Sequence, residues 1–157
     1  MSIAYTLAGL DRLELLVATR IEVLRAANQL EEGADMSRVE AESRAYYQRA
    51  LADGSHTAYL AFEGDAFVGA GGVSYFQVMP TWHNPTGRKA YIMNMYVRPE
   101  HRRRGIATGL LDRLVDDARQ KGVTAISLEA TEMGRPLYEK YGFVTMLHEM
   151  ELPMDGK

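Results

Sequence analysis

The sequence predicts an α+β fold in which a mixed, mostly antiparallel sheet is flanked by about four helices. Apolar residues recur at helical spacing in four segments, and strand-like apolar runs lie between those segments. One strand-helix-strand unit requires a parallel pair of strands with a right-handed crossover. The 157 residues suffice for one domain with a substantial core, and no repeat, low-complexity segment or linker divides them. We therefore predict a single domain over residues 1–157.

The N-terminal part is expected to form a short strand and two helices. Ile3–Leu7 is the candidate strand. The pattern Asp11–Glu14 resembles a capping box, and the apolar spacing after it predicts a helix that reaches about Leu30. A second capping box, Ser37–Glu40, opens a helix that reaches about Ala52.

Three strands are expected in the middle of the chain. Thr57–Phe62 and Ala66–Phe76 are joined by the turn Glu63–Asp65, which predicts a hairpin. The second of these strands contains three glycines, Gly69, Gly71 and Gly72. Glycines inside a strand indicate a bulge or a close contact. A proline-containing loop then leads to a third strand, Ala90–Val97.

The C-terminal part alternates helices with strands. An apolar face recurs from Ile106 onward, and Gly122 ends that helix as its C′ residue. Val123–Leu128 is an apolar run typical of a buried strand. A short helix is expected over Glu132–Tyr141, and a final strand over Phe143–Leu152. The complete order is β-α-α-β-β-β-α-β-α-β.

The most informative motif lies where the helix after the third central strand begins. Its sequence is Arg102-Arg103-Arg104-Gly105-Ile106-Ala107. A helix start offers unpaired backbone N–H groups and the positive end of the macrodipole. Glycine lets an anion approach those groups closely, and the arginines add positive charge. The motif therefore predicts a phosphate or pyrophosphate site, with a solvated turn that binds no ligand as the alternative.

Two motifs together resemble those of a known family. Arg102, Gly105 and Ala107 fill the fixed positions of the acyl-CoA signature of the GNAT superfamily of N-acetyltransferases. Leu137–Phe143, with sequence LYEKYGF, resembles the closing motif of the same superfamily. Two such motifs in the right order are far more specific than either alone. The family often has Asn-x-x-Ala before the second motif, where this chain has Thr131 and Gly134.

The resemblance implies the GNAT fold and an N-acetyltransferase that transfers an acetyl group from acetyl-CoA to an amine by direct attack. The backbone N–H groups of 103–108 would cradle the pyrophosphate. The backbone of Met95, Tyr96 and Val97 would pair with the pantetheine arm, which requires the sheet to splay beside that strand. The implied cofactor-binding residues are Met95, Tyr96, Val97, Arg102, Arg103, Arg104, Gly105, Ile106, Ala107 and Thr108.

Three residues are candidates for catalysis. In the resemblance, Tyr138 points at the thioester sulfur. A thiol pKa of about 8.5 and a tyrosine pKa of about 10 are close enough for Tyr138 to act as the general acid. Asn94, inside an apolar strand, either orients the substrate or a water molecule or caps a bulge. Glu129 is a candidate base beside Glu132 and His83, but isolated carboxylates are mostly surface residues, and no spacing singles one out.

The acceptor is expected to be a small-molecule or peptide amine. Tyr75, Phe76, Trp82 and His83 either line the acceptor pocket or pack against a second subunit, and a homodimer fits the habit of the family. The net charge of −3 gives no indication of a nucleic-acid or membrane partner. We expect no metal site. The chain has no cysteine, which excludes disulfides and a cysteine nucleophile, and we expect a cytoplasmic location.

Two other functions remain open at this stage. The first is a non-catalytic acyl-CoA-binding or regulatory module that has kept the cofactor site. The second is a nucleotide-phosphate binder, which the absence of the P-loop and dinucleotide-binding patterns disfavours.

Overall fold

The computed structural model of the protein describes residues 2–154. The strands are β1 (Ile3–Ala8), β2 (His56–Glu63), β3 (Ala66–Gln77), β4 (Arg88–Val97) and β5 (Ala125–Leu128). The helices are α1 (Leu13–Asn28), α2 (Ser37–Asp53), α3 (Ile106–Gln120) and α4 (Arg135–Tyr141), with short 3-10 turns at Leu10–Arg12 and Pro99–His101.

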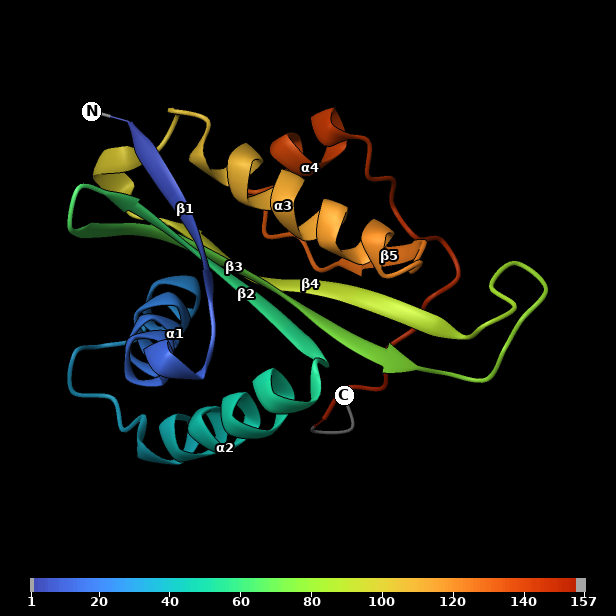
Figure 1. Ribbon diagram of the computed structural model, residues 1–157, viewed down its shortest axis with the longest axis horizontal. Helices are drawn as coiled ribbons and strands as arrows, with labels where there is room; N and C mark the ends of the chain where they lie inside the picture. Colours follow the sequence, from blue (N-terminus) through green and yellow to red (C-terminus); the bar gives the residue numbers. More distant parts are fainter. Residues whose placement is uncertain (1, 155–157) are drawn as a thin grey trace.

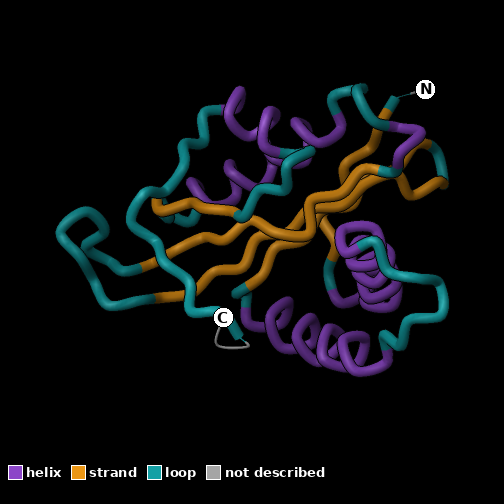
Figure 2. Tube along the Cα trace, turned by 180° about the vertical axis from the view of Figure 1, so that it is seen from behind, coloured by secondary structure: helices purple, strands orange, loops and turns teal. Residues whose placement is uncertain are grey.

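The strands form one sheet in the order β1-β2-β3-β4-β5. Neighbours from β1 to β4 are antiparallel, and β5 runs parallel to β4. Helices α1 and α2 cover one face of the sheet, while α3 and α4 cover the other (Figures 1 and 2). The predicted α+β architecture, a mixed and mostly antiparallel sheet with four helices, is confirmed.

Each face of the sheet has its own apolar core. The stripe of α3 that packs on β3 and β4 is fully buried and consists of Ile106, Leu110, Leu111, Leu114, Val115 and Ala118. This stripe has the residues and the spacing that the sequence predicts. On the opposite face, Leu16 and Val17 of α1 and Tyr47 of α2 pack against Leu60 of β2. Burial of these side chains holds the helices on the sheet.

The predicted final strand over Phe143–Leu152 is wrong. This segment is an irregular loop after α4, and its apolar side chains, such as Val144 and Leu147, are each 84% exposed. A strand needs a neighbour for its N–H and C=O groups. Within residues 2–154, β5 is only four residues long and pairs with β4 alone. Apolar spacing without such a partner gives no strand.

The two predicted capping boxes are also wrong. The N-cap residues of α1 and α2 are Arg12 and Met36, and neither helix start receives a side-chain cap. The carboxylate of Asp35 instead accepts the Ser37 N–H over 3.0 Å. Helix α1 ends before Leu30, because Gln29 turns into the left-handed conformation at φ 51°. The boundaries of these helices therefore depend on local backbone geometry, which the capping pattern alone does not determine.

Strand β4 is irregular at Asn94, which has a positive φ of 61°. The register with β3 shifts there, so that Gly72 faces Met93 whereas Ala70 faces Tyr96. One extra residue in β4 is a β-bulge. Strand β5 pairs only with 89–92 of β4. Residues 93–97 therefore have no strand neighbour on that side, and the sheet splays beside them as expected.

The glycines of β3 mark both a bulge and close contacts. A Cβ at Gly69 would lie 2.9 Å from the carbonyl oxygen of Tyr96. A Cβ at Gly71 would lie 2.8 Å from the sulfur of Met95 and 2.9 Å from a methyl carbon of Leu114. These contacts let α3 and β4 approach β3 closely and confirm the prediction from the glycine pattern.

Candidate active site

A cavity of about 630 Å³ lies beside the splayed end of β4. Helix α1 borders it on one side, and the start of α3 together with α4 borders it on the other. Every predicted cofactor-binding residue lines this cavity except Arg104, and Tyr138 lines it as well. A larger groove of about 800 Å³ runs between β5 and the C-terminal loop, but none of the predicted phosphate-binding residues lines it. We therefore take the cavity at β4 as the candidate site.

The start of α3 is an uncapped helix N-terminus at the edge of this cavity. Gly105 is the N-cap residue, with φ 80°, a conformation that glycine adopts at little cost. No side chain caps the helix, and its first turn contains no acidic residue. The first backbone bond runs from the N–H of Gly109 to the carbonyl of Gly105 over 3.0 Å. The N–H groups of 106–108 thus have no acceptor within the helix, which is the arrangement that suits an anion at a helix start.

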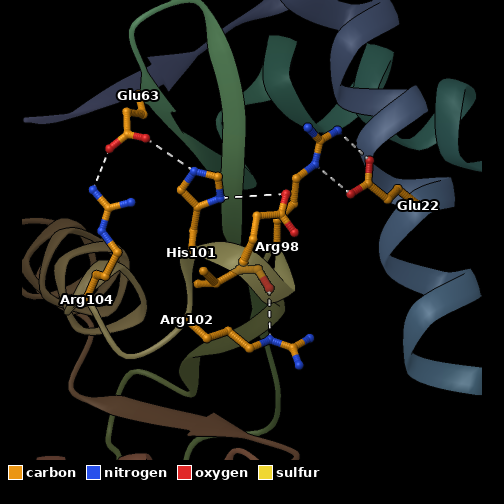
Figure 3. A network of polar contacts seen from close by, with 8 residues as sticks. Glu22, Glu63, Arg98, His101, Arg102 and Arg104 are labelled. Carbon is orange, nitrogen blue, oxygen red and sulfur yellow. Dashed lines mark hydrogen bonds and ion pairs between the residues drawn. The ribbon is translucent and has the colours of Figure 1, made fainter. Parts of the chain in front are cut away.

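The three arginines of the motif have different surroundings, and Figure 3 shows two of them, Arg102 and Arg104. Arg102 donates from Nε to the carbonyl of Val97 over 3.2 Å, which holds the turn against the end of β4. Arg103 lines the cavity and has a positive φ of 65°. Arg104 forms an ion pair with Glu63 and does not line the cavity. Its hydrogen bond to Glu63 is also the main cause that lowers the pKa of that carboxyl. The geometry therefore gives Arg104 a structural contact outside the cavity.

Two hydrogen bonds join the end of β4 to α1. Nε and Nη2 of Arg98 donate to the two carboxylate oxygens of Glu22, each over 3.0 Å (Figure 3). The Arg98 N–H also donates to the carbonyl of Val68 over 2.8 Å. The hydrogen bond from Arg98 lowers the pKa of Glu22, against the effect of burial. This clamp fixes α1 beside the cavity, where Val23 forms part of the wall.

Tyr138 extends from α4 into the wall of the cavity and is only 9% exposed. Its ring packs edge-on against Phe143, with centroids 6.0 Å apart. A Cβ at Gly134 would lie 3.0 Å from the Tyr138 ring, so glycine makes room for it. Burial raises the pKa of Tyr138, and its hydroxyl makes no hydrogen bond to any other residue in 2–154. The hydroxyl is thus protonated and free to donate to a ligand.

Thr131 and Gly134, where the chain departs from the family pattern, both line the cavity. The Thr131 hydroxyl accepts the Gly134 N–H over 3.1 Å. This bond stabilises the turn that leads into α4. The hydroxyl hydrogen of Thr131 remains available for a carbonyl of a bound ligand.

Asn94 and Glu129 do not line the cavity. The Asn94 side chain points towards α1, where its Oδ1 accepts a hydrogen bond from Nη1 of Arg20 over 3.0 Å. It directly precedes Met95, which is part of the cavity wall. Glu129 is exposed beyond β5, and its carboxylate contributes, after burial, to the raised pKa of Tyr91. The geometry brings Asn94 to the edge of the site and leaves Glu129 outside it.

The other acceptor-side candidates lie away from the cavity. Glu132 and His83 are exposed and do not line it. Trp82 is 90% exposed on the loop between β3 and β4, which projects from the body of the protein (Figure 1). Tyr75 donates its hydroxyl hydrogen to Asp117 of α3. None of them is positioned by the fold to contact a ligand in the cavity.

Sequence reasoning missed a group of polar side chains under α1 and α2. The Tyr46 hydroxyl lies 2.8 Å from Nδ1 of His56 and 2.7 Å from Oγ of Ser74. Burial lowers the pKa of His56 to about 4, and the charge of Arg20 acts in the same direction. The residues come from α1, α2, β2 and β3, so no sequence spacing links them. Only the assembled fold brings them together.

Comparisons with known proteins agree on one family. A model of the acetyltransferase (GNAT) family matches residues 22–143. Thialysine N-epsilon-acetyltransferase of Mus musculus is 29% identical over 82 residues, which are 52% of this chain and 45% of that protein. The uncharacterized N-acetyltransferase YsnE of Bacillus subtilis is 29% identical over 92 residues, 55% of each chain. The chain thus spans about half the length of the curated relatives it matches.

Solved structures match over almost the whole chain. A predicted acetyltransferase from Clostridium acetobutylicum, solved with acetyl-CoA, has a TM-score of 0.88 and 35% identity, covering 98% of this chain and 97% of that one. A GCN5-related N-acetyltransferase from Ralstonia eutropha JMP134 has a TM-score of 0.83 and 31% identity, covering 99% and 100%. The expectation of an acetyl-CoA-dependent N-acetyltransferase is thereby confirmed at the level of the family. The chain belongs to the acetyltransferase (GNAT) family.

Proposed function

We propose that this protein transfers an acetyl group from acetyl-CoA to an amine by direct attack of that amine on the thioester. One observation carries the proposal: the unpaired edge of β4, the uncapped start of α3 and the Tyr138 side chain all border one cavity. Family membership supports it, as does the structural neighbour solved with acetyl-CoA. The curated relatives named for thialysine N-epsilon-acetylation support an amine as the acceptor.

The residues present fit acetyl-CoA, which supplies an activated acetyl thioester when bound. The N–H groups of 106–108 and the side chain of Arg103 hold the pyrophosphate. The edge of 95–97 has no strand neighbour towards β5, so it is free to pair with the amide groups of the pantetheine arm. A backbone N–H of Tyr96 or Val97 polarises the thioester carbonyl as negative charge develops on its oxygen.

Tyr138 acts as the general acid. The amine nitrogen forms a bond to the acetyl carbon, the carbon–sulfur bond breaks, and the tyrosine hydroxyl gives its proton to the leaving thiolate. The amine must also lose a proton. Glu129, Glu132 and His83 do not border the cavity, so none of the three is placed to take this proton, and we assign it to water.

A matched pair of variants at Gly105 tests the proposal. Asparagine and aspartate both tolerate the positive φ of this position, and they differ only in charge. We expect calorimetry to show acetyl-CoA binding by the wild type and by Gly105→Asn, with at least about tenfold weaker binding by Gly105→Asp. Gly105→Asn places a side chain on the same left-handed backbone, so backbone strain alone would not explain a loss confined to Gly105→Asp. A folded wild type that binds no acetyl-CoA would overturn the proposal.

The runner-up is a non-catalytic acyl-CoA-binding or regulatory module. It predicts the same calorimetric result but no acetyl transfer to any amine in a broad panel. Turnover by the wild type therefore separates the two functions.

A further inference from the structure

The carboxylate of Glu63 contacts the β4–α3 turn, residues 98–105, although it does not line the cavity. Its Oε1 lies 3.3 Å from Nε2 of His101, and its Oε2 accepts a hydrogen bond from Nη2 of Arg104 (Figure 3). In residues 2–154 it is the one carboxylate within 4 Å of two basic side chains. Because Glu63 ends strand β2, these contacts join the β2–β3 hairpin to the β4–α3 turn.

The two contacts flank the residue of this turn that has the least favourable backbone. Arg103 has a φ of 65°, in the left-handed region that residues other than glycine rarely adopt. Such a conformation persists only where the surrounding structure holds it. His101 lies two residues before Arg103, and Arg104 follows it directly. Glu63 thus holds both flanks of Arg103 from outside the cavity.

Backbone hydrogen bonds hold the first half of the β4–α3 turn but not the second. The N–H groups of 101–102 donate to the carbonyls of 98–99, over 2.9 and 3.3 Å. Among the described residues, neither Arg103 nor Arg104 takes part in a backbone hydrogen bond. The second half leads directly into the N–H groups of 106–108 at the start of α3. The direction of these groups therefore depends on side-chain contacts, of which those to Glu63 are two.

The charge of Glu63 alone would act against an anionic ligand, because like charges repel each other. Its ion pair with Arg104 also uses a positive charge at a position that does not line the cavity. A purely electrostatic role therefore predicts that removal of this charge tightens the binding of an anion. A positioning role predicts the opposite sign, because the turn would lose the contacts that hold it.

We propose that Glu63 is a positioning residue for the pyrophosphate of acetyl-CoA. It acts through Arg104 and His101, and it keeps the β4–α3 turn in the conformation that directs the N–H groups of 106–108 at the cavity. This inference rests on the proposed function for the identity of the ligand. The turn itself can be observed without that ligand, so the two proposals can fail separately.

Calorimetry with acetyl-CoA on Glu63→Gln tests the sign of the effect. We expect binding at least about fivefold weaker than that of the wild type, because fewer molecules hold the strained turn in the binding conformation. Glu14→Gln is the matched control, since Glu14 pairs with Arg44 over 2.7 Å and does not line the cavity. Its affinity should equal that of the wild type. Urea unfolding should show both variants to be fully folded under the conditions of the measurement.

An Arg104→Met background tests whether the effect passes through the proposed contact. There Glu63→Gln should weaken acetyl-CoA binding less than it does in the wild type, because only the contact with His101 is left to lose. A general structural role of Glu63 would give the same loss in both backgrounds. Equal losses, or a Glu63→Gln variant that binds as tightly as the wild type or more tightly, would overturn the inference.

NMR order parameters of the ligand-free protein give a readout that needs no acetyl-CoA. The N–H groups of 103–105 should be rigid in the wild type and in Glu14→Gln, at about 0.85, and should fall towards the flexible range below about 0.6 in Glu63→Gln. Unchanged order parameters in Glu63→Gln would overturn the inference as well. A folded wild type that binds no acetyl-CoA would instead count against the proposed function.

Discussion

The imidazole of His56 fills the space beside Gly72. A Cβ at position 72 would lie 2.7 Å from Nε2 of His56 and 3.0 Å from its neighbouring ring carbon. The ring is 6% exposed and is held from the other side by the Tyr46 hydroxyl at 2.8 Å. Helix α2 is therefore fixed on the sheet through a polar contact that only glycine at position 72 permits.

Gly72→Ala should destabilise the protein by about 1–3 kcal/mol, because the new methyl group must displace a buried ring. Urea unfolding measures this loss. Gly33→Ala is the matched control, since a Cβ at Gly33 meets no atom within 4 Å, and it should leave stability nearly unchanged. In a His56→Ala background the same Gly72→Ala change should cost much less. An undiminished cost in the double variant would show that the imidazole is not the obstacle.

The stability of the protein should fall as the pH drops from about 6.5 towards 4. Burial lowers the pKa of His56 from 6.5 in the unfolded chain to about 4 in the folded one, so between these values the unfolded state binds the extra proton. The stabilisation is complete above pH 6.5 and is lost on acidification, by about 3 kcal/mol in total. Urea unfolding at several pH values measures it. His56→Gln should flatten the dependence in this window, and a slope equal to that of the wild type would contradict the assignment.

The sequence predicted the elements that follow from strong local patterns. The α3 stripe from Ile106 to Ala118 has an uninterrupted helical period, and the glycine triplet of β3 indicated a bulge or close contacts, of which the close contacts lie at the glycines and the bulge lies opposite them in β4. The turn 102–107 could be singled out as a phosphate-site candidate because glycine and arginine at a helix start carry their chemistry locally. All of these features depend on neighbours in sequence.

What the sequence did not reveal depends on distant partners. The segment 143–152 has apolar residues suited to a strand, yet no edge in 2–154 pairs with it. Arg104 belongs to the motif, yet its guanidinium forms an ion pair with Glu63 of the β2–β3 hairpin. The contact between Arg20 and Asn94 joins residues 74 positions apart, and no local pattern predicts it.

The clamp between Glu22 and Arg98 should contribute about 1 kcal/mol at neutral pH, because it is bidentate but partly exposed. Glu22→Gln should remove most of this in urea unfolding at pH 7. The hydrogen bond from Arg98 lowers the pKa of Glu22, so the contribution is present above the ordinary glutamate value of 4.5 and is lost as the pH falls through the lower folded-state pKa. The difference in unfolding free energy between the wild type and Glu22→Gln should therefore shrink in strong acid. A difference that is constant with pH would mean that packing, not charge, is responsible.

Tyr138→Phe should lower kcat at least about tenfold and leave the Kd for acetyl-CoA unchanged, because only proton transfer to the leaving thiolate is removed. Tyr141→Phe is the matched control: this tyrosine lies on the same helix, but its hydroxyl donates to Asp112 and it does not line the cavity. Its kcat should equal that of the wild type. Since burial raises the pKa of Tyr138 above 10, the wild type should also keep its general acid protonated at pH 9, and kcat should not yet decline there. Equal kcat values for the wild type and Tyr138→Phe would remove the tyrosine from the mechanism and leave water as the proton donor to the thiolate.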